Sequence, residues 1–168
     1  MKESNFQFTD PCLTSMEFRE NRDFSIEKGK EIEIQTEIGV SNTKISENEA
    51  VVKLKVNLGD ENAPFYLETI FMAKFKWNSE LEDSKVNSFL NQNAPALLLS
   101  YARPIISMIT NASRFPAYNI PFINFADAKK IKCFWKNRLN LKFIYKRKRS
   151  SWRNVEYKHS SIFRIKAT

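Results

Sequence analysis

Three runs of alternating residues dominate the first half of this chain. Residues 30–45 place Ile32, Ile34, Ile38 and Val40 on one parity and Glu31, Glu33, Gln35 and Glu37 on the other. Similar alternation covers residues 51–58 and 65–77, and the turn-forming sequence Gly-Asp-Glu-Asn separates those two runs. A period of two residues is typical of a strand with one buried face and one wet face. The runs therefore predict three long strands, the last two joined as a hairpin.

A weaker pattern near Met16–Arg19 predicts a fourth strand. Beyond Asn78 the alternation stops, and Ser84 is a candidate N-cap for a helix through Val86, Phe89 and Leu90. Strands followed by helices, rather than alternating with them, favour an α+β fold. We expect a four-stranded antiparallel sheet with two main helices packed on one face.

The second helix is expected to begin near Pro95, because a missing amide hydrogen is harmless at a helix start. Apolar residues then recur every three to four positions, at Leu98, Tyr101 or Ala102, Ile105, Met108 or Ile109, and Ala112. This spacing predicts one buried stripe. Pro104 cannot donate the usual backbone hydrogen bond, so we expect it to kink the helix or split it at Arg103.

The composition argues against an enzyme and against a membrane or secreted protein. The N-terminal sequence MKESNFQFTD has no apolar core typical of a signal peptide, and the longest apolar stretch, 94–99, is far too short for a membrane span. Cys12 and Cys133 lie far apart, which fits a reducing compartment. His159 is the single histidine, and there is neither a phosphate-binding glycine loop nor a zinc motif. We expect a cytoplasmic protein without catalytic residues, metal or cofactor.

Charge divides the chain into two parts. The 168 residues have a formal net charge of +8, but residues 129–168 contain 14 of the 27 Lys and Arg and only one of the 19 acids. Residues 1–128 are therefore mildly acidic. We expect a domain over 1–128 and a basic, aromatic-rich extension over 129–168.

The segment 101–125, YARPIISMITNASRFPAYNIPFINF, resembles the signature region of the SecB family of export chaperones. The matching motifs are Tyr101-Ala102-Arg103, the run Ile105 to Met108, Phe115-Pro116 with Asn119, and Asn124-Phe125. The hairpin with strand 51–58 and the restart Phe65-Tyr66-Leu67-Glu68 is also similar. The resemblance covers roughly residues 16–125. It implies a four-stranded antiparallel sheet with two helices on one face, assembled as a dimer of dimers.

The resemblance also implies a function. SecB proteins hold non-native polypeptides in apolar grooves, without ATP, and deliver them to the SecA export ATPase, while some relatives guard antitoxins of toxin–antitoxin systems. A holder of many sequences needs exposed apolar surface. The loop 114–125 has that composition, and two prolines that hinder regular packing. We predict client-binding residues at Phe115, Tyr118, Ile120, Phe122 and Phe125, with Phe75 and Trp77 at the end of the last strand. The alternative for each loop residue is that it caps the core.

Two departures from the family pattern affect the expected partners. Tyr66 and Glu68 match the implied SecA-docking surface, but Ser15 and Arg19 replace the acids expected on the first strand, and Glu17 is expected on a different parity. The docking surface is therefore expected to be incomplete.

The basic extension also differs from the family. Its interleaved cations and aromatics leave open a nucleic-acid-binding protein or a contact with an anionic membrane.

Overall fold

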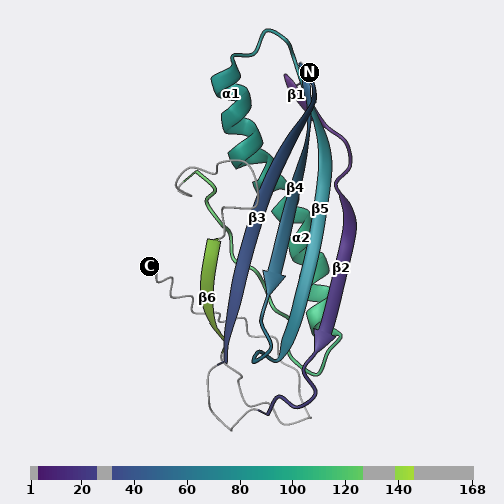
Figure 1. The fold of residues 1–168 in the computed structure, drawn as a ribbon, viewed down its shortest axis with the longest axis vertical. Helices are drawn as coiled ribbons and strands as arrows, with labels where there is room; N and C mark the ends of the chain where they lie inside the picture. Colours follow the sequence, from purple (N-terminus) through teal and green to yellow (C-terminus); the bar gives the residue numbers. More distant parts are fainter. Residues whose placement is uncertain (1–3, 26–31, 127–138, 146–168) are drawn as a thin grey trace.

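The protein forms a twisted antiparallel sheet with its helices on one face. The computed structural model describes residues 4–25, 32–126 and 139–145. The sheet order is β1-β5-β4-β3-β6, and β2 also pairs with β5. The strands are β1 (Phe6–Phe8), β2 (Cys12–Glu20), β3 (Ile32–Ser46), β4 (Glu49–Leu58), β5 (Phe65–Trp77) and β6 (Leu139–Tyr145). Figure 1 shows the strands along the long axis of the molecule, with α2 behind them.

The alternating residues explain which face of the sheet is covered. Along β5 every second side chain from Phe65 to Trp77 is buried, and the intervening ones are partly or fully exposed. Strand β4 alternates in the same way, with Val52, Leu54 and Val56 fully buried. Each buried apolar side chain contributes about 1.5–3 kcal/mol to folding relative to an exposed one. This face therefore supplies much of the core.

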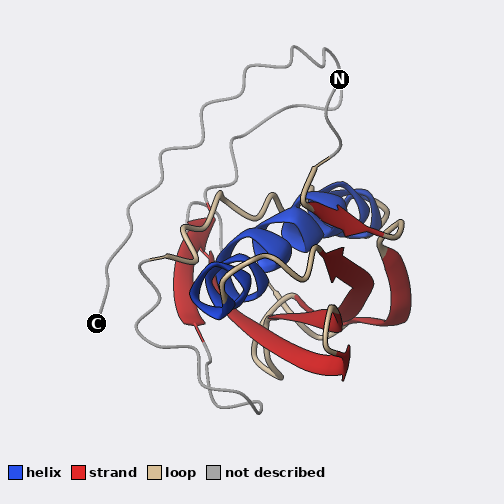
Figure 2. Cartoon of the chain, turned by 90° about the horizontal axis from the view of Figure 1, so that it is seen from above, coloured by secondary structure: helices blue, strands red, loops and turns tan. Residues whose placement is uncertain are grey.

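The helical layer consists of α1 (Asp83–Ser88), the π-helical turn η1 (Phe89–Asn93) and α2 (Ala94–Asn111). Figure 2 shows the helices lying along one face of the sheet. The buried side of α2 consists of Ala94, Pro95, Leu98, Leu99, Ala102, Ile106 and Thr110. These residues meet the apolar face of β4 and β5, so the predicted α+β architecture is confirmed.

One prediction about the helices is wrong, and at Pro104 one of the two expected alternatives is excluded. Ser84 is not the N-cap, because α1 begins at Asp83 after Glu82. Pro104 does not split the second helix, which is continuous from Ala94 to Asn111. Pro104 is exposed, while Ala102 and Ile106 on either side of it are fully buried. Packing of this buried stripe holds the helix together across the missing hydrogen bond.

All four predicted strands are present, and the described residues contain two more. The weakly predicted strand at 16–19 is the longer β2, which pairs with β5 from Cys12 to Glu20. The three-residue β1 pairs with the other end of β5. Strand β6 comes from the basic extension and pairs with β3. The predicted nucleic-acid or membrane contacts of the extension concern mainly 129–138 and 146–168, which lie outside the described residues.

Candidate functional site

Six of the seven predicted client-binding residues are buried in the core. They are Phe75, Trp77, Phe115, Tyr118, Ile120 and Phe125, each at most 8% exposed. The two prolines of loop 114–125 predicted that its side chains cannot all be buried, and of its aromatic residues only Phe122 remains exposed. Burial makes these six residues part of the core, and Phe122 is the one predicted client-binding residue whose side chain is exposed.

Specific hydrogen bonds attach the loop to the sheet and to α2. The hydroxyls of Tyr118 and Thr36 are 2.8 Å apart in a fully buried pair. The amide of Tyr118 donates to Oγ1 of Thr110 at 2.8 Å. Burial raises the pKa of the Tyr118 phenol, so this hydroxyl stays protonated and available for hydrogen bonding. The loop is consequently held in place without forming a helix or a strand.

The other predicted pair, at the end of β5, is covered by the N-terminal strand. The ring of Phe6 stacks on Phe89 with centroids 3.9 Å apart and lies 6.2 Å from Trp77. Phe8 lies 5.9 Å from Phe75. The aromatic cluster at this end of the sheet is therefore filled by the chain itself, and only Phe8 of the group is exposed.

Phe122 differs from its neighbours, because 84% of its surface is exposed. The guanidinium of Arg103 lies 4.0 Å from the centre of the Phe122 ring, and Nε of Arg103 donates to the carbonyl of Ile120 at 2.7 Å. A cation over an aromatic face is attractive by about 0.5–1 kcal/mol at an exposed site. Arg103 thus holds the ring in solvent while the rest of the loop packs inward.

Further exposed apolar side chains lie on the helix side of the sheet. Leu13 and Met16 lie on the face of β2 that is directed toward the helices, opposite Phe71 and Thr69. Both side chains remain exposed at the sheet edge. The α2 residues Tyr101 and Met108 are exposed as well, on the side of that helix away from its buried stripe. Sequence analysis missed Leu13 and Met16, because a register shift between Leu13 and Ser15 breaks simple alternation.

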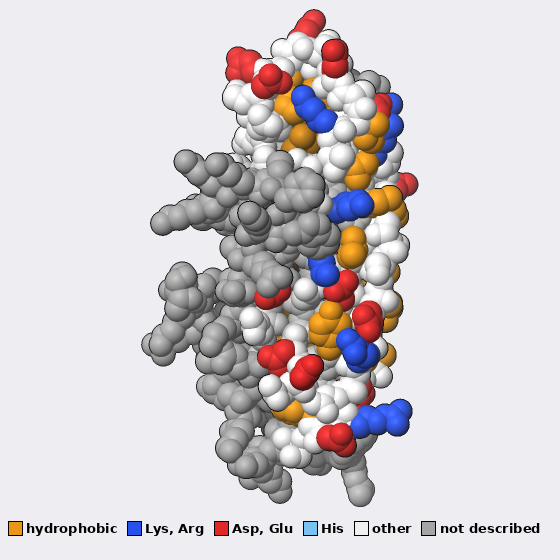
Figure 3. All heavy atoms as spheres, in the orientation of Figure 1, with side chains coloured by type: hydrophobic (Ala, Val, Ile, Leu, Met, Phe, Trp, Pro, Cys, Tyr) orange, Lys and Arg blue, Asp and Glu red, His pale blue; other side chains and the backbone are white. Residues whose placement is uncertain are grey.

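The opposite face of the sheet carries charge. The strand registers place Glu17, Glu68, Asn57 and Glu37 in one row across β2, β5, β4 and β3. Nζ of Lys55 lies 2.7 Å from Glu68, and this hydrogen-bonded cation lowers the pKa of that carboxyl. The Tyr66 hydroxyl donates to Glu68 at 2.9 Å, and burial raises the pKa of the phenol. Figure 3 shows acidic and basic side chains interspersed on this face.

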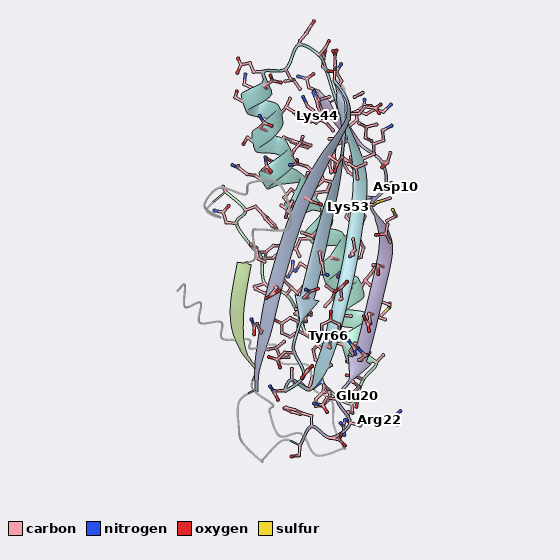
Figure 4. The ribbon with its side chains drawn as sticks, viewed as in Figure 1. Asp10, Glu20, Arg22, Lys44, Lys53 and Tyr66 are labelled. Carbon is pink, nitrogen blue, oxygen red and sulfur yellow. The ribbon has the colours of Figure 1, made fainter. Side chains whose placement is uncertain are left out.

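The structure corrects the predicted position of Glu17. Glu17 lies directly opposite Glu68, on the same face as Ser15 and Arg19. Nε of Arg19 is 2.9 Å from Glu17, and its guanidinium lies 5.0 Å from the centre of the Tyr66 ring. Figure 4 shows Tyr66 near one end of this face and Lys53 nearer its middle. The face thus combines a carboxylate row with flanking cations.

Neither metal ligation nor a membrane span is found in the described part of the chain. No group of three or more His, Cys, Asp or Glu among residues 4–25, 32–126 and 139–145 could hold a metal ion. No helix among those residues is both long and apolar enough to cross a membrane.

The chain thus forms an antiparallel sheet with helices on one face and leaves several apolar side chains exposed to solvent. The sequence model of the SecB family, described as preprotein translocase subunit SecB, matches residues 14–133. The chain therefore belongs to the SecB family. No curated protein matches it.

A solved structure of a SecB-like chaperone shares this fold at low sequence identity. The Mycobacterium tuberculosis SecB-like chaperone Rv1957, in complex with a ChAD peptide from the Rv1956 HigA1 antitoxin, is 12% identical with a TM-score of 0.56. The match covers 71% of this chain and 91% of that one. A Streptococcus agalactiae protein of unknown function is 13% identical with a TM-score of 0.43, covering 70% of this chain and 97% of that one.

Proposed function

We propose that this protein is an ATP-independent holder of non-native polypeptides in the cytoplasm. The observation that carries the proposal is the set of apolar side chains left in solvent on the helix side: Phe8, Leu13, Met16 and Phe122. We call these four residues the client set. A holder without nucleotide needs apolar surface that tolerates many sequences, and flexible aliphatic or aromatic side chains provide it.

The exposed residues of α2 favour self-association rather than client binding. Tyr101 and Met108 lie on the side of α2 that faces away from the sheet. A second copy packed against this side would bury both residues, and a symmetric pair is the commonest solution for such a surface. We propose a homo-oligomer, either a dimer or a tetramer, in which the client set remains open to solvent.

The identity of the client has two candidates. Family membership favours precursor proteins kept competent for export. The solved complex of the Mycobacterium tuberculosis relative with an antitoxin peptide favours a dedicated antitoxin client instead. Both clients are extended polypeptides, so the same apolar side chains suit either one.

The outer face of the sheet is the proposed docking surface for SecA. Glu17 and Glu68 lie side by side there, which makes the acidic row longer than the sequence indicated. Arg19 and Lys55 pair with these carboxylates. We therefore propose that docking is weak, because a partner must compete with cations already in place.

Loss of the β2 members of the client set should weaken client holding. Replacing Leu13 and Met16 together by Ser removes two apolar contacts, so we expect about ten- to a hundredfold weaker suppression of aggregation of a chemically unfolded model protein. The measurement is light scattering without nucleotide. The control variant carries Cys12→Ser and Ser15→Ala, which change the opposite face of the same strand and should leave holding unchanged. Equal activity of both variants would contradict the assignment.

A further inference from the structure

The β3 edge of the sheet is occupied by a segment from the basic extension. Residues 139–145 pair with β3 in antiparallel register, from Ile32 opposite Tyr145 to Ile38 opposite Leu139. The family match ends at residue 133, so this strand comes from a part of the chain that the family model does not include. Residues 39–46 of β3 pair with β4 only, within the described part of the chain.

The direction of the backbone groups identifies which residues of β3 face the added strand. The amide of Gly59 donates to the carbonyl of Gln35 at 2.8 Å, so the backbone groups of Gln35 point toward β4. Successive residues of a strand point their backbone groups to opposite sides. Ile34, Thr36 and Ile38 therefore point theirs toward β6, and Thr36 is opposite Leu141. Without β6 these groups would form an open edge.

Charge and sequence both favour this pairing within one chain. Residues 129–168 carry 14 Lys and Arg, whereas the 1–128 part of the chain has more acids than bases. Attraction between the two parts acts over about 8–10 Å at physiological salt and raises the local concentration of the segment. The alternation Leu139, Leu141, Phe143 also lies opposite Ile38, Thr36 and Ile34, which are the buried parity of β3.

An uncovered β3 would give the sheet two open edges. Strand β2 forms the other edge, and it pairs only with β5 in the described part of the chain. Addition of a β2 edge to a β3 edge is a head-to-tail contact, which can repeat without closing, whereas contact between two like surfaces closes as a dimer. We propose that residues 139–145 are an edge strand that blocks pairing of β3 with a second copy of this chain. The protein then forms only closed oligomers and no open-ended chain of copies.

The test replaces one residue of the full-length protein. Leu141→Pro removes the amide that would donate to β3, while Leu141→Ala keeps it and serves as the matched control. We expect amide exchange at Ile34, Thr36 and Ile38 to be at least about tenfold faster in the proline variant at low protein concentration. The amides of Glu37 and Gly39, which point toward β4, should keep their protection. Exchange equal to that of the alanine variant would overturn the proposal.

Particle size tests the blocking role. Sedimentation of Leu141→Pro should show species that grow with concentration, whereas the alanine variant keeps one size. Lost protection without any increase in particle size would overturn the role of β6 as a block.

Mixing labelled Leu141→Pro with unlabelled wild-type protein tests whether pairing occurs within one chain. The labelled amides should stay fast, and protection supplied by another molecule would overturn the cis arrangement. None of these readouts requires client binding.

Discussion

Replacing Gly59 by Ala should destabilise the protein by at least about 2–4 kcal/mol, because two costs act at the same position. Gly59 has a φ of +73°, in the left-handed region that side chains disfavour. An added Cβ would also clash with the carbonyl oxygen of Phe65 and lie 3.0 Å from Cβ of Ala63. Phe65 begins β5 and is buried in the core, so the backbone there cannot move freely. Chemical denaturation measures the loss.

Gly39→Ala is the matched control for this substitution. An added Cβ at Gly39 would meet only Cβ of Lys55, at 3.9 Å, which is ordinary van der Waals contact. Its effect on the free energy of unfolding should stay within about 0.5 kcal/mol. Similar losses at both positions would contradict the account, since only Gly59 combines positive φ with a blocked Cβ position.

The second large effect separates a core residue from a surface residue in the same loop. Tyr118→Ser removes a buried ring and its hydrogen bond to Thr36, so we expect a loss of about 3–5 kcal/mol in the free energy of unfolding. Phe122→Ser should leave that free energy within about 1 kcal/mol of wild type, because the ring is exposed and touches Arg103. The same variant should weaken client holding by about tenfold.

The conservative substitution Tyr118→Phe helps to interpret this pair. It keeps the ring but leaves the buried Thr36 hydroxyl without its partner, and about 1–3 kcal/mol should be lost. Two results would contradict the assignment of Phe122 to the client set: unfolding of Phe122→Ser, or a folded Phe122→Ser variant with undiminished holding. A stable Tyr118→Ser variant would show that the loop is not part of the core.

The sheet could be predicted from the sequence because its strands have one buried face. A single buried face places apolar residues at every second position, as at Val52, Leu54 and Val56. This pattern can be recognised in the sequence without knowing which strands pair. Helix α2 was predicted because its apolar residues recur every three to four positions, which places them on one side of a helix. The continuity of α2 across Pro104 could not be predicted, because it depends on packing against strands distant in sequence.

The site was harder to predict than the fold. The two prolines indicated that the side chains of loop 114–125 cannot all be buried by regular packing, yet hydrogen bonds with the side chains of Thr36 and Thr110 allow Tyr118 to be buried without regular structure. The exposed edge residue Met16 was missed because the register shift between Leu13 and Ser15 breaks the simple alternation of β2. The period-two pattern of 139–145 was present in the sequence, but its pairing with β3 joins segments that are far apart in the chain.

The methyl signals of the methionines test the central claim most directly. Met16 belongs to the client set on the helix side, whereas Met72 lies on the opposite face of the sheet, in register with Lys53. The experiment titrates methyl-labelled protein with a permanently unfolded model polypeptide, without nucleotide, and records both signals. The account predicts that Met16 shifts or broadens while Met72 does not change. A response at Met72 with none at Met16, or no response at either, would contradict it.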